Sequence, residues 1–261
     1  MTDINPGTDF LLNGAVTPHA HLHQHETQPN HAIYEVLRAI HGVPIFAEEH
    51  YGRLHSSLLA TGAGLPISFN AFMLQLTTLI KHLNIQEGNI KILILNQSPY
   101  PIYCYQIKHS YPTSFEYKYG VKLSTWPFER NNPAVKQYST DYKNKVAWFK
   151  ENEKIYEALL ENKQGAITEG SQSNIFFIRN YKLYTPPGHM VLNGITRNKT
   201  IEISKTLEVS LTFEPVLTCD LKTFDAAFLT GTSPKILPVK QINNVIFDPD
   251  HRLAFKVNAG I

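Results

Sequence analysis

The stretch ITEGSQSNIFFI, residues 167–178, places one carboxylate, Glu169, between two strand-like segments. The segment before it ends at Thr168, and the segment after it, residues 175–178, is strongly apolar. Carboxylates rarely lie beside such strands unless a nearby group makes use of their charge. Only small polar residues surround Glu169 in the sequence, so its charge must serve a partner from elsewhere.

Three other stretches place backbone amides or a cation where an anion could bind. Gly194 opens a predicted helix, and the free amides and dipole of that helix start, at Ile195 and Thr196, favour a phosphate. The hydroxyl-rich turn 230–233 follows an apolar strand, a sequence typical of an anion-binding nest. Arg53 could supply a bidentate guanidinium. Taken alone, each feature is more simply explained as a turn, a strand end or a solvated helix face.

Taken together, these features describe a single ligand. With Glu169 and a lysine at a strand-to-helix junction, they fit a molecule that has a phosphate, a basic ring nitrogen and an aldehyde. Pyridoxal 5′-phosphate has all three groups. A carboxylate beside its ring nitrogen keeps that nitrogen protonated, so the ring can accept the electrons of a carbanion. This chemistry would explain an isolated Glu169.

The elements that must position these residues follow from hydrophobic periodicity and turn signals. In the first half the pattern predicts antiparallel strands and two helices, with Ser68 as the cap of the second helix. The predicted strands are 10–17, 32–47 with a turn at His41-Gly42, 90–96 and 101–109, and the predicted helices are 48–62 and 68–85. Arg53 therefore lies on the first helix.

The second half follows a break in the pattern at 110–120, which is predicted to be a linker. We expect two α+β domains, a smaller one over 1–115 and a larger one over 116–261. The predicted elements of the second are a strand at 121–128, a loop at 129–139, a helix at about 140–155, a hairpin at 166–178, a strand at 182–187, a helix at 194–208 and strands at 211–216, 226–233 and 236–247.

Four stretches, in this order, resemble the fold-type IV pyridoxal-phosphate enzymes, which include the branched-chain and D-amino acid aminotransferases of class IV and aminodeoxychorismate lyase. They are YEVLRAIHGVPIFAEEHYGRL (34–54), YEALLENKQGAITEGSQSNIFFI (156–178), LYTPPGHMVLNGITRNKTIEI (183–203) and FLTGTSPKILPV (228–239). The resemblance implies the two-domain α+β fold of D-amino acid aminotransferases, with the cofactor in the interdomain cleft. It also implies a homodimer.

The same resemblance implies a role for each matching residue. Glu169 would face the pyridine nitrogen, Leu192 would pack on one face of the ring, and Tyr34 would border the substrate pocket. The phosphate would be held by Arg53, the amides of Ile195 and Thr196, and Thr232.

The lysine that forms the Schiff base must be chosen between two candidates. Lys136 and Lys143 precede Glu169 by 33 and 26 residues (169 − 136 and 169 − 143). In the family the lysine ends a strand, and a helix and a strand follow before the glutamate. Only Lys136 leaves room for both, because Lys143 would already lie in the first helical turn. We therefore assign Lys136 as the catalytic lysine, whose amine forms the imine and then moves a proton.

The substrate-binding part of the family pattern is less complete. The stretch SPYPIYCYQIKH, residues 98–109, lacks the arginine with which both kinds of transaminase bind the substrate. Arg38 or Lys108 could replace it, and Arg38 is our candidate. The predicted function is amino-group transfer between an amino acid and a 2-oxo acid; the alternative is aminodeoxychorismate lyase, which forms 4-aminobenzoate and pyruvate.

The composition is that of a folded globular protein. The chain has 261 residues, 43% of them hydrophobic, a net charge of +2, and two cysteines far apart in sequence. No basic stripe indicates nucleic acid, and no apolar run reaches membrane-spanning length. The sequence therefore predicts a cytoplasmic protein with reduced thiols, small-molecule substrates and neither membrane nor nucleic-acid partners.

A second class of function rests on the stretch HAHLHQH, in which His19, His21, His23 and His25 occupy alternate positions. In a strand all four side chains would point to one face and could bind zinc, copper or nickel. The simpler explanation is a polar loop, and we assign no metal to the protein. A metal-binding module would need neither Lys136 nor Glu169.

Overall fold

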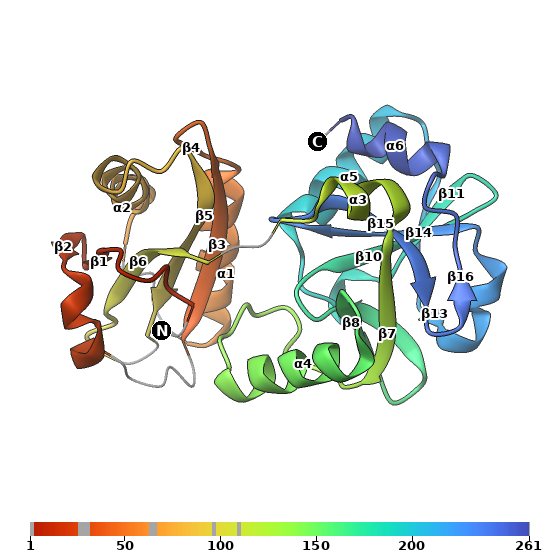
Figure 1. The fold of residues 1–261 in the computed structure, drawn as a ribbon, viewed down its shortest axis with the longest axis horizontal. Helices are drawn as coiled ribbons and strands as arrows, with labels where there is room; N and C mark the ends of the chain where they lie inside the picture. The colour runs from red at the N-terminus through yellow and green to blue at the C-terminus, as the bar shows by residue number, and fades with distance from the viewer. Residues whose placement is uncertain (1–2, 26–31, 63–66, 96–97, 109–110, 261) are drawn as a thin grey trace. The chain divides into compact units, whose positions relative to one another are not determined.

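The structure is a computed structural model that describes residues 3–25, 32–62, 67–95, 98–108 and 111–260 (Figure 1). The chain forms two compact units. Residues 1–110 and 135–142 make up the first unit, and residues 111–134 and 143–261 make up the second. The segment 135–142 therefore returns to the first unit after the chain has entered the second. No helix in the described ranges is both long and apolar enough to cross a lipid bilayer.

In the part of the first unit that the structure describes, the strands form a six-stranded antiparallel sheet in the order β2-β1-β6-β5-β3-β4. Its strands are β1 (Phe10–Leu12), β2 (Ala15–Thr17), β3 (Ile33–Ile40), β4 (Val43–Pro44), β5 (Glu87–Ile94) and β6 (Ile102–Ile107). The predicted turn between β3 and β4 is confirmed, with positive φ at His41 and Gly42. Each predicted strand pair of this half is present.

Two helices, α1 (Ala47–Ala60) and α2 (Phe69–His82), pack on one face of this sheet through a shared apolar core. The Ser68 side chain accepts a hydrogen bond from the Ala71 amide and caps α2, as predicted. On β3, Ile33 and Leu37 belong to this core, so Glu35 between them points to the same face. Tyr34 points to the opposite face, where a second apolar cluster lies.

The histidine-rich stretch His19–His25 forms a short 3-10 helix, η1, not a strand. A 3-10 helix has about three residues per turn, so alternate side chains do not share a face. The metal-binding alternative required a strand in which the four histidines share one face, and that strand is not formed. The His19 ring is instead placed by Thr8, whose carbonyl oxygen lies 3.1 Å from Nδ1. The side chains of residues 23–25 lie outside the described part of the chain, and no group of metal-binding side chains occurs within it.

The second unit is built on a larger, mixed sheet. Among the described residues it has ten strands, in the order β12-β11-β10-β14-β15-β7-β8-β9-β13, with β16 paired to β15. The pairs β7–β8, β7–β15 and β11–β12 are parallel, and the remaining pairs are antiparallel. The strands are β7 (Val121–Pro127), β8 (Glu157–Glu161), β9 (Ala166–Gly170), β10 (Asn174–Arg179), β11 (Lys182–Thr185), β12 (Leu211–Phe213), β13 (Val216–Leu217), β14 (Ala226–Gly231), β15 (Lys235–Ile242) and β16 (Val245–Ile246).

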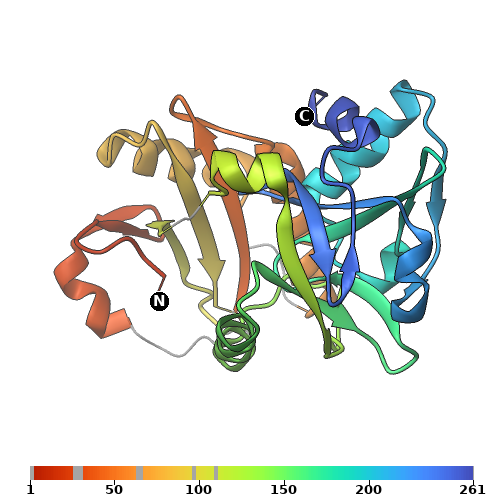
Figure 2. The same cartoon turned by 45° about the vertical axis from the view of Figure 1, so that its right-hand side comes forward.

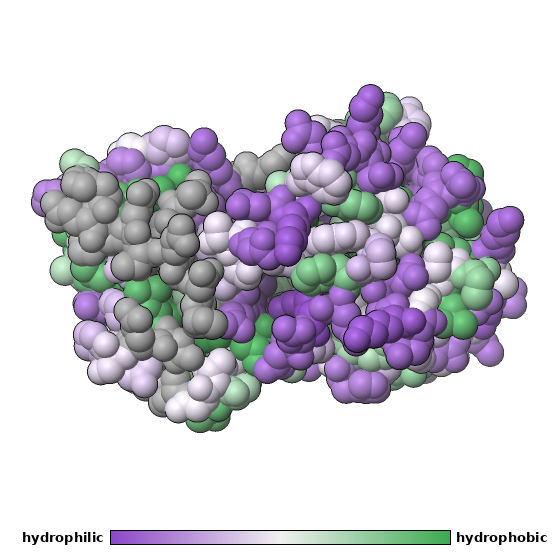
Figure 3. All heavy atoms as spheres, turned by 90° about the horizontal axis from the view of Figure 1, so that it is seen from below, coloured by the Kyte–Doolittle hydropathy of each residue, from purple (hydrophilic) through white to green (hydrophobic). Residues whose placement is uncertain are grey.

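The helices of this half are α3 (Ser114–Tyr119), α4 (Thr140–Glu153), α5 (Ile195–Thr206) and α6 (Arg252–Asn258), with 3-10 turns η2 (Gly188–Met190) and η3 (Thr218–Thr223). Helices α5 and α6 pack beside each other, α5 on β14 and α6 on β15 (Figure 2). Figure 3 views the side on which α4 lies in Figure 1, and hydrophilic side chains dominate the second unit there. Lys145 on α4 is exposed.

Two predictions for this half need correction. The chain does pass from the first unit to the second within the expected linker at 110–120, but this segment also contains α3, because Thr113 and Glu116 form a reciprocal capping box at its start. The expected hairpin at 166–178 is not one: β9 pairs with β8 and β13, whereas β10 pairs with β11 and β14. Glu169 therefore lies where the chain passes between strands that do not pair with each other.

Candidate active site

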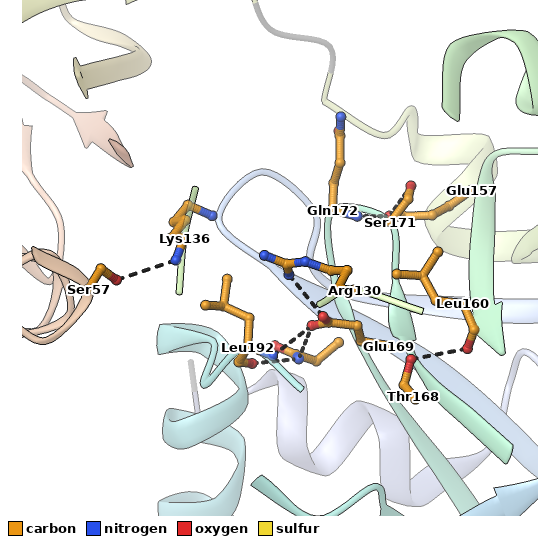
Figure 4. A network of polar contacts seen from close by, with 11 residues as sticks. Ser57, Arg130, Lys136, Glu157, Leu160, Thr168, Glu169, Ser171, Gln172 and Leu192 are labelled. Carbon is orange, nitrogen blue, oxygen red and sulfur yellow. Dashed lines mark hydrogen bonds and ion pairs between the residues drawn. The ribbon is translucent and has the colours of Figure 1, made fainter. Parts of the chain in front are cut away.

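Glu169, near the end of β9, is held by donors from three other segments of the second unit (Figure 4). Arg130, in the loop after β7, places Nη1 2.9 Å from Oε1 and forms an ion pair. The Leu192 N–H donates to Oε2 at 2.9 Å, and Asn174 Nδ2 lies 3.4 Å from the same oxygen. Glu169 is only 3% exposed, and the guanidinium offsets the cost of burying its charge. These donors fix the orientation of the Glu169 carboxylate, which can accept a further hydrogen bond.

A second buried carboxylate, Glu157 on β8, organises the turn between β9 and β10. Ser171 Oγ donates to Oε1 at 3.1 Å, and the Gln172 N–H donates to the same oxygen (Figure 4). Ser173 Oγ donates to Oε2 at 3.0 Å. Burial raises the pKa of the Glu157 carboxyl, against the effect of these donors. Gly170 has no room for a side chain, because a Cβ would come within 2.2 Å of Ser173 Oγ and 3.0 Å of Glu157 Oε1. The turn that follows Glu169 is therefore closely packed around Glu157.

Helix α5 begins after Gly194, which occupies the N-cap position with φ −65°. Any residue can adopt this φ, so the glycine is not required by conformation. It is required for room, because a Cβ would come within 2.1 Å of Asn174 Oδ1. As a glycine, the N-cap residue has no side chain with which to cap the helix. Its first amides, including those of Ile195 and Thr196, are therefore the groups that an anion would contact.

The turn after β14 lies in the same unit, and α5 packs on β14. Thr232 lies in that turn. Thr230 is opposite Asn174 in the ladder between β10 and β14, so the two side chains share a face of the sheet. Its Oγ1 is buried and has no hydrogen-bond partner among the described residues. A buried hydroxyl of this kind suits a polar ligand on that face.

Arg197 connects the first turn of α5 to the chain that precedes it. Its Nη2 donates to the Pro186 carbonyl at 2.9 Å, and Nη1 lies 3.5 Å from Asn193 Oδ1. Burial lowers the pKa of Arg197, and the charge of Glu169 opposes this effect. The arginine thus fixes both ends of the loop that contains Leu192.

In the first unit, Arg53 on α1 is bound to a buried carboxylate on β3. Its Nε and Nη2 donate to Oε1 and Oε2 of Glu35, each at 2.7 Å. His50 Nδ1 lies 2.8 Å from the same Oε2. Burial alone would raise the pKa of Glu35, but Arg53 and His50 outweigh it and hold that pKa well below its usual range. Burial lowers the pKa of His50, so its ring is neutral at pH 7.

Lys136 lies in the segment that returns to the first unit. Its carbonyl accepts from the Tyr34 N–H at 3.1 Å, and its own N–H donates to Ser57 Oγ on α1 at 3.3 Å (Figure 4). Its Nζ lies 4.9 Å from the centroid of the Tyr34 ring. Lys143, the alternative, lies in the first turn of α4. Helix α4 and strand β8 lie between Lys136 and Glu169, which is itself in β9, as expected.

Lys91 on β5 is a second ammonium group at the Tyr34 ring, 4.9 Å from its centroid. It also lies 4.7 Å from the centroid of the Tyr138 ring. The Lys91 side chain is buried, and it forms an ion pair with Asp3. Tyr34 is therefore contacted by two lysines, of which the sequence had indicated only Lys136.

The candidate Arg38 also lies on β3, four residues beyond Tyr34, with Nη2 3.8 Å from Glu87 Oε2. Four residues along a strand correspond to about 13 Å, so the Arg38 Cα is far from that of Tyr34.

Within each unit, then, the structure groups several of the predicted site residues. The first unit brings Lys136 to Tyr34, and the second brings Leu192 to Glu169 beside the start of α5. The sequence reasoning missed the residues that hold these groups in place: Glu35, His50, Lys91, Arg130, Glu157, Asn174 and Arg197. For Glu35 a signal existed, since a carboxylate alternating with apolar residues on one strand face implies a buried partner cation.

The model of the family described as amino-transferase class IV matches residues 32–242. A probable branched-chain-amino-acid aminotransferase of Rickettsia conorii is 29% identical, over 93% of this chain and 91% of its own length. Many further relatives and solved structures are similar to the chain.

Two solved structures illustrate the range of related enzymes. A putative branched-chain amino acid aminotransferase from Thermotoga maritima has a TM-score of 0.82 and 26% identity and covers 96% of this chain and 93% of its own. A putative 4-amino-4-deoxychorismate lyase from Legionella pneumophila has a TM-score of 0.79 and 24% identity and covers 89% and 92%. These similarities confirm the expected fold type IV. Since the family model spans most of the sequence, the chain belongs to the class IV aminotransferases.

Proposed function

We propose that this class IV aminotransferase binds pyridoxal 5′-phosphate and transfers an amino group between an amino acid and a 2-oxo acid. The observation that carries the proposal is the Glu169 carboxylate, fixed by Arg130 and the Leu192 amide in the same unit as the uncapped start of α5. The donor set fits the cofactor: a fixed carboxylate for a ring N–H, and helix amides for a phosphate. The buried Thr230 hydroxyl adds a polar group on the same sheet face as Asn174.

In this proposal Glu169 accepts the hydrogen bond of the protonated ring nitrogen, and Leu192 packs on the ring. The phosphate contacts are assigned to Arg53, the amides of Ile195 and Thr196, and Thr232. When bound, the cofactor supplies an aldehyde that takes up the amino group and a ring that accepts electrons.

Lys136 provides the remaining chemistry. Its Nζ is the amine to which the cofactor would attach, and afterwards the base that removes the proton from the substrate α-carbon. The backbone contacts of Lys136 with Tyr34 and Ser57 support this role, because they fix the main chain from which the amine extends. Tyr34 borders the substrate in this proposal. Arg38 or Lys91 is the cation that binds the carboxylate of the substrate.

The names of the relatives favour branched-chain amino acids as substrates. Both cysteines are free thiols, which supports a reducing, cytoplasmic setting. The homodimer rests on the family resemblance. The lyase from Legionella pneumophila supports one alternative, elimination of pyruvate from aminodeoxychorismate, which would use the same lysine and glutamate.

Absorption spectroscopy of the purified protein tests the proposal. Reconstitution with the cofactor should give a yellow protein. Borohydride should remove the colour and leave the reduced cofactor covalently attached to Lys136. Without borohydride, leucine, isoleucine or valine should bleach the yellow absorption band, and a 2-oxo acid should restore it. A yellow protein that no amino acid bleaches, but that releases pyruvate from aminodeoxychorismate, would be the lyase. A protein that stays colourless with the cofactor would refute the proposal.

A further inference from the structure

Asn174 touches three groups to which the proposed cofactor site assigns different tasks. It is the first residue of β10 and is 5% exposed. Its Nδ2 donates to the Leu192 carbonyl at 2.9 Å and lies 3.4 Å from Glu169 Oε2. Its Oδ1 lies 2.1 Å from the point that a Cβ on Gly194 would occupy. The Asn174 amide thus contacts three residues: Glu169, Leu192 and Gly194. Glu169 and Leu192 are assigned to the cofactor ring, and Gly194 is the N-cap of the helix assigned to the phosphate.

These contacts close a ring of interactions. Leu192 donates its N–H to Glu169 Oε2, and its carbonyl accepts from the Asn174 amide, which also approaches that Oε2. Two residues further on, Gly194 packs against the other end of the same amide. A shift of the start of α5 relative to Glu169 would therefore break a hydrogen bond or produce a steric clash.

We propose that Asn174 is a positioning residue that fixes the distance between the ring-nitrogen contact, Glu169, and the phosphate-binding start of α5. The inference rests on the proposed cofactor. A rigid ligand with a ring nitrogen at one end and a phosphate at the other binds well only when both contacts are set at its own span. Asn174 sets that span, and Gly194 is a glycine because the amide needs the space.

Arg130 provides the matched control for this proposal. Its Nη1 donates to Glu169 Oε1, whereas Asn174 Nδ2 lies near Oε2, and Arg130 comes from the loop after β7, not from the start of α5. Losing Arg130 should weaken the ring-nitrogen contact alone. Losing Asn174 should weaken the ring-nitrogen contact and also misplace the phosphate amides.

The first experiment is a double-mutant cycle on the apoprotein. Gly194→Ala should lower Tm by roughly 5 °C through overpacking against Asn174, but by far less in the Asn174→Ala background, where the methyl group has space. Gly52→Ala, in α1, is the control and should not lower Tm, because no atom of the described residues lies within 4 Å of the added Cβ. An equal loss in both backgrounds would overturn the proposal.

The second experiment compares pyridoxal 5′-phosphate with pyridoxal, which shares the ring and aldehyde but lacks the phosphate. The Kd of pyridoxal divided by the Kd of pyridoxal 5′-phosphate measures what the phosphate contributes to binding. Asn174→Ala should weaken both ligands and reduce this ratio at least threefold, whereas Arg130→Gln should weaken both and leave the ratio unchanged. If Asn174→Ala also leaves the ratio unchanged, the coupling is wrong. If the wild-type protein binds neither ligand, the proposed function fails, and the positioning role fails with it.

Discussion

Arg53 binds Glu35 through one edge of its guanidinium, with Nε on one carboxylate oxygen and Nη2 on the other, each at 2.7 Å. Glu35 is fully buried, and the Arg53 side chain is 11% exposed. The two hydrogen bonds therefore fix the plane and orientation of the Arg53 guanidinium, to which the proposed function assigns a phosphate contact.

Glu35→Gln should destabilise the apoprotein strongly, because it leaves the Arg53 charge buried without this counter-ion. Breaking such a buried pair typically costs about 3–5 kcal/mol of unfolding free energy. Glu87→Gln is the matched control, because Glu87 pairs with Arg38 at 3.8 Å and its side chain is 53% exposed. A surface pair of this kind contributes about 0–1 kcal/mol. Urea unfolding of both variants measures the difference, and equal losses would contradict the importance of the buried pair.

The unfolding free energy should also fall as the pH is lowered from neutral. The first decrease should come from His50, and a later one from Glu35. Burial lowers the folded-state pKa of His50 below the usual 6.5, so the unfolded state binds the proton more readily and stability decreases as the pH falls through about 6.5. Glu35 also has a lowered folded-state pKa, and its contribution is lost further down, below its unfolded value of about 4.5.

Unfolding free energies measured between about pH 2 and pH 8 would test this order. His50→Gln should remove the decrease near pH 6.5 and keep the decrease at lower pH. A His50→Gln profile that superimposes on the wild-type profile would show that His50 does not titrate as described.

Much of the fold could be predicted because its signals are local. The caps and turns at Ser68, His41-Gly42 and Gly194 gave the right boundaries. The sequence could not show that β9 and β10 do not pair, because that choice depends on strands far away in the chain. In the site, the motif around Glu169 was informative, whereas its partner Arg130 comes from an irregular loop with no periodic pattern. The ion pairs of buried charges likewise depend on tertiary packing.

The choice of catalytic lysine can be tested with a pair of variants. Lys136→Ala should abolish the borohydride-stable attachment of the cofactor and nearly all turnover, because the other amine at Tyr34, that of Lys91, is held in an ion pair by Asp3. Lys143→Ala, in the first turn of α4, should keep both. Mass mapping of the reduced protein gives the answer directly. A label that persists in Lys136→Ala and disappears in Lys143→Ala would show that the assignment based on spacing is wrong.

Lys91 and Arg38 compete for the role of the cation that receives the substrate carboxylate. Lys91 Nζ lies 4.9 Å from the Tyr34 ring centroid, whereas Arg38 is four residues along the strand and pairs with Glu87. Lys91→Met should therefore raise KM for the amino acid about tenfold or more, the equivalent of one lost charge-assisted hydrogen bond. Arg38→Met should change KM little. If only Arg38→Met raises KM, the original candidate from the sequence is the correct one.

Glu157→Gln tests whether the turn after Glu169 depends on the carboxylate beneath it. Glu157 accepts from Ser171, Gln172 and Ser173, but a glutamine has only one oxygen, so at least one of these hydrogens loses its acceptor. Leaving a buried donor unsatisfied costs about 1–3 kcal/mol, so the unfolding free energy should fall by that amount. Glu161→Gln is the control and should lose less, because the Glu161 carboxylate is only half-buried and accepts from the Thr218 hydroxyl, outside this turn.

The same Glu157→Gln change should also weaken cofactor binding. The turn joins Glu169, which is proposed to face the ring nitrogen, to Asn174, whose amide lies 3.4 Å from the Glu169 carboxylate. Fluorescence titration of the apoprotein with pyridoxal 5′-phosphate measures the effect, and Glu161→Gln should leave the Kd unchanged. A Glu157→Gln variant with full stability and full cofactor affinity would show that the serine hydroxyls hold the turn without Glu157.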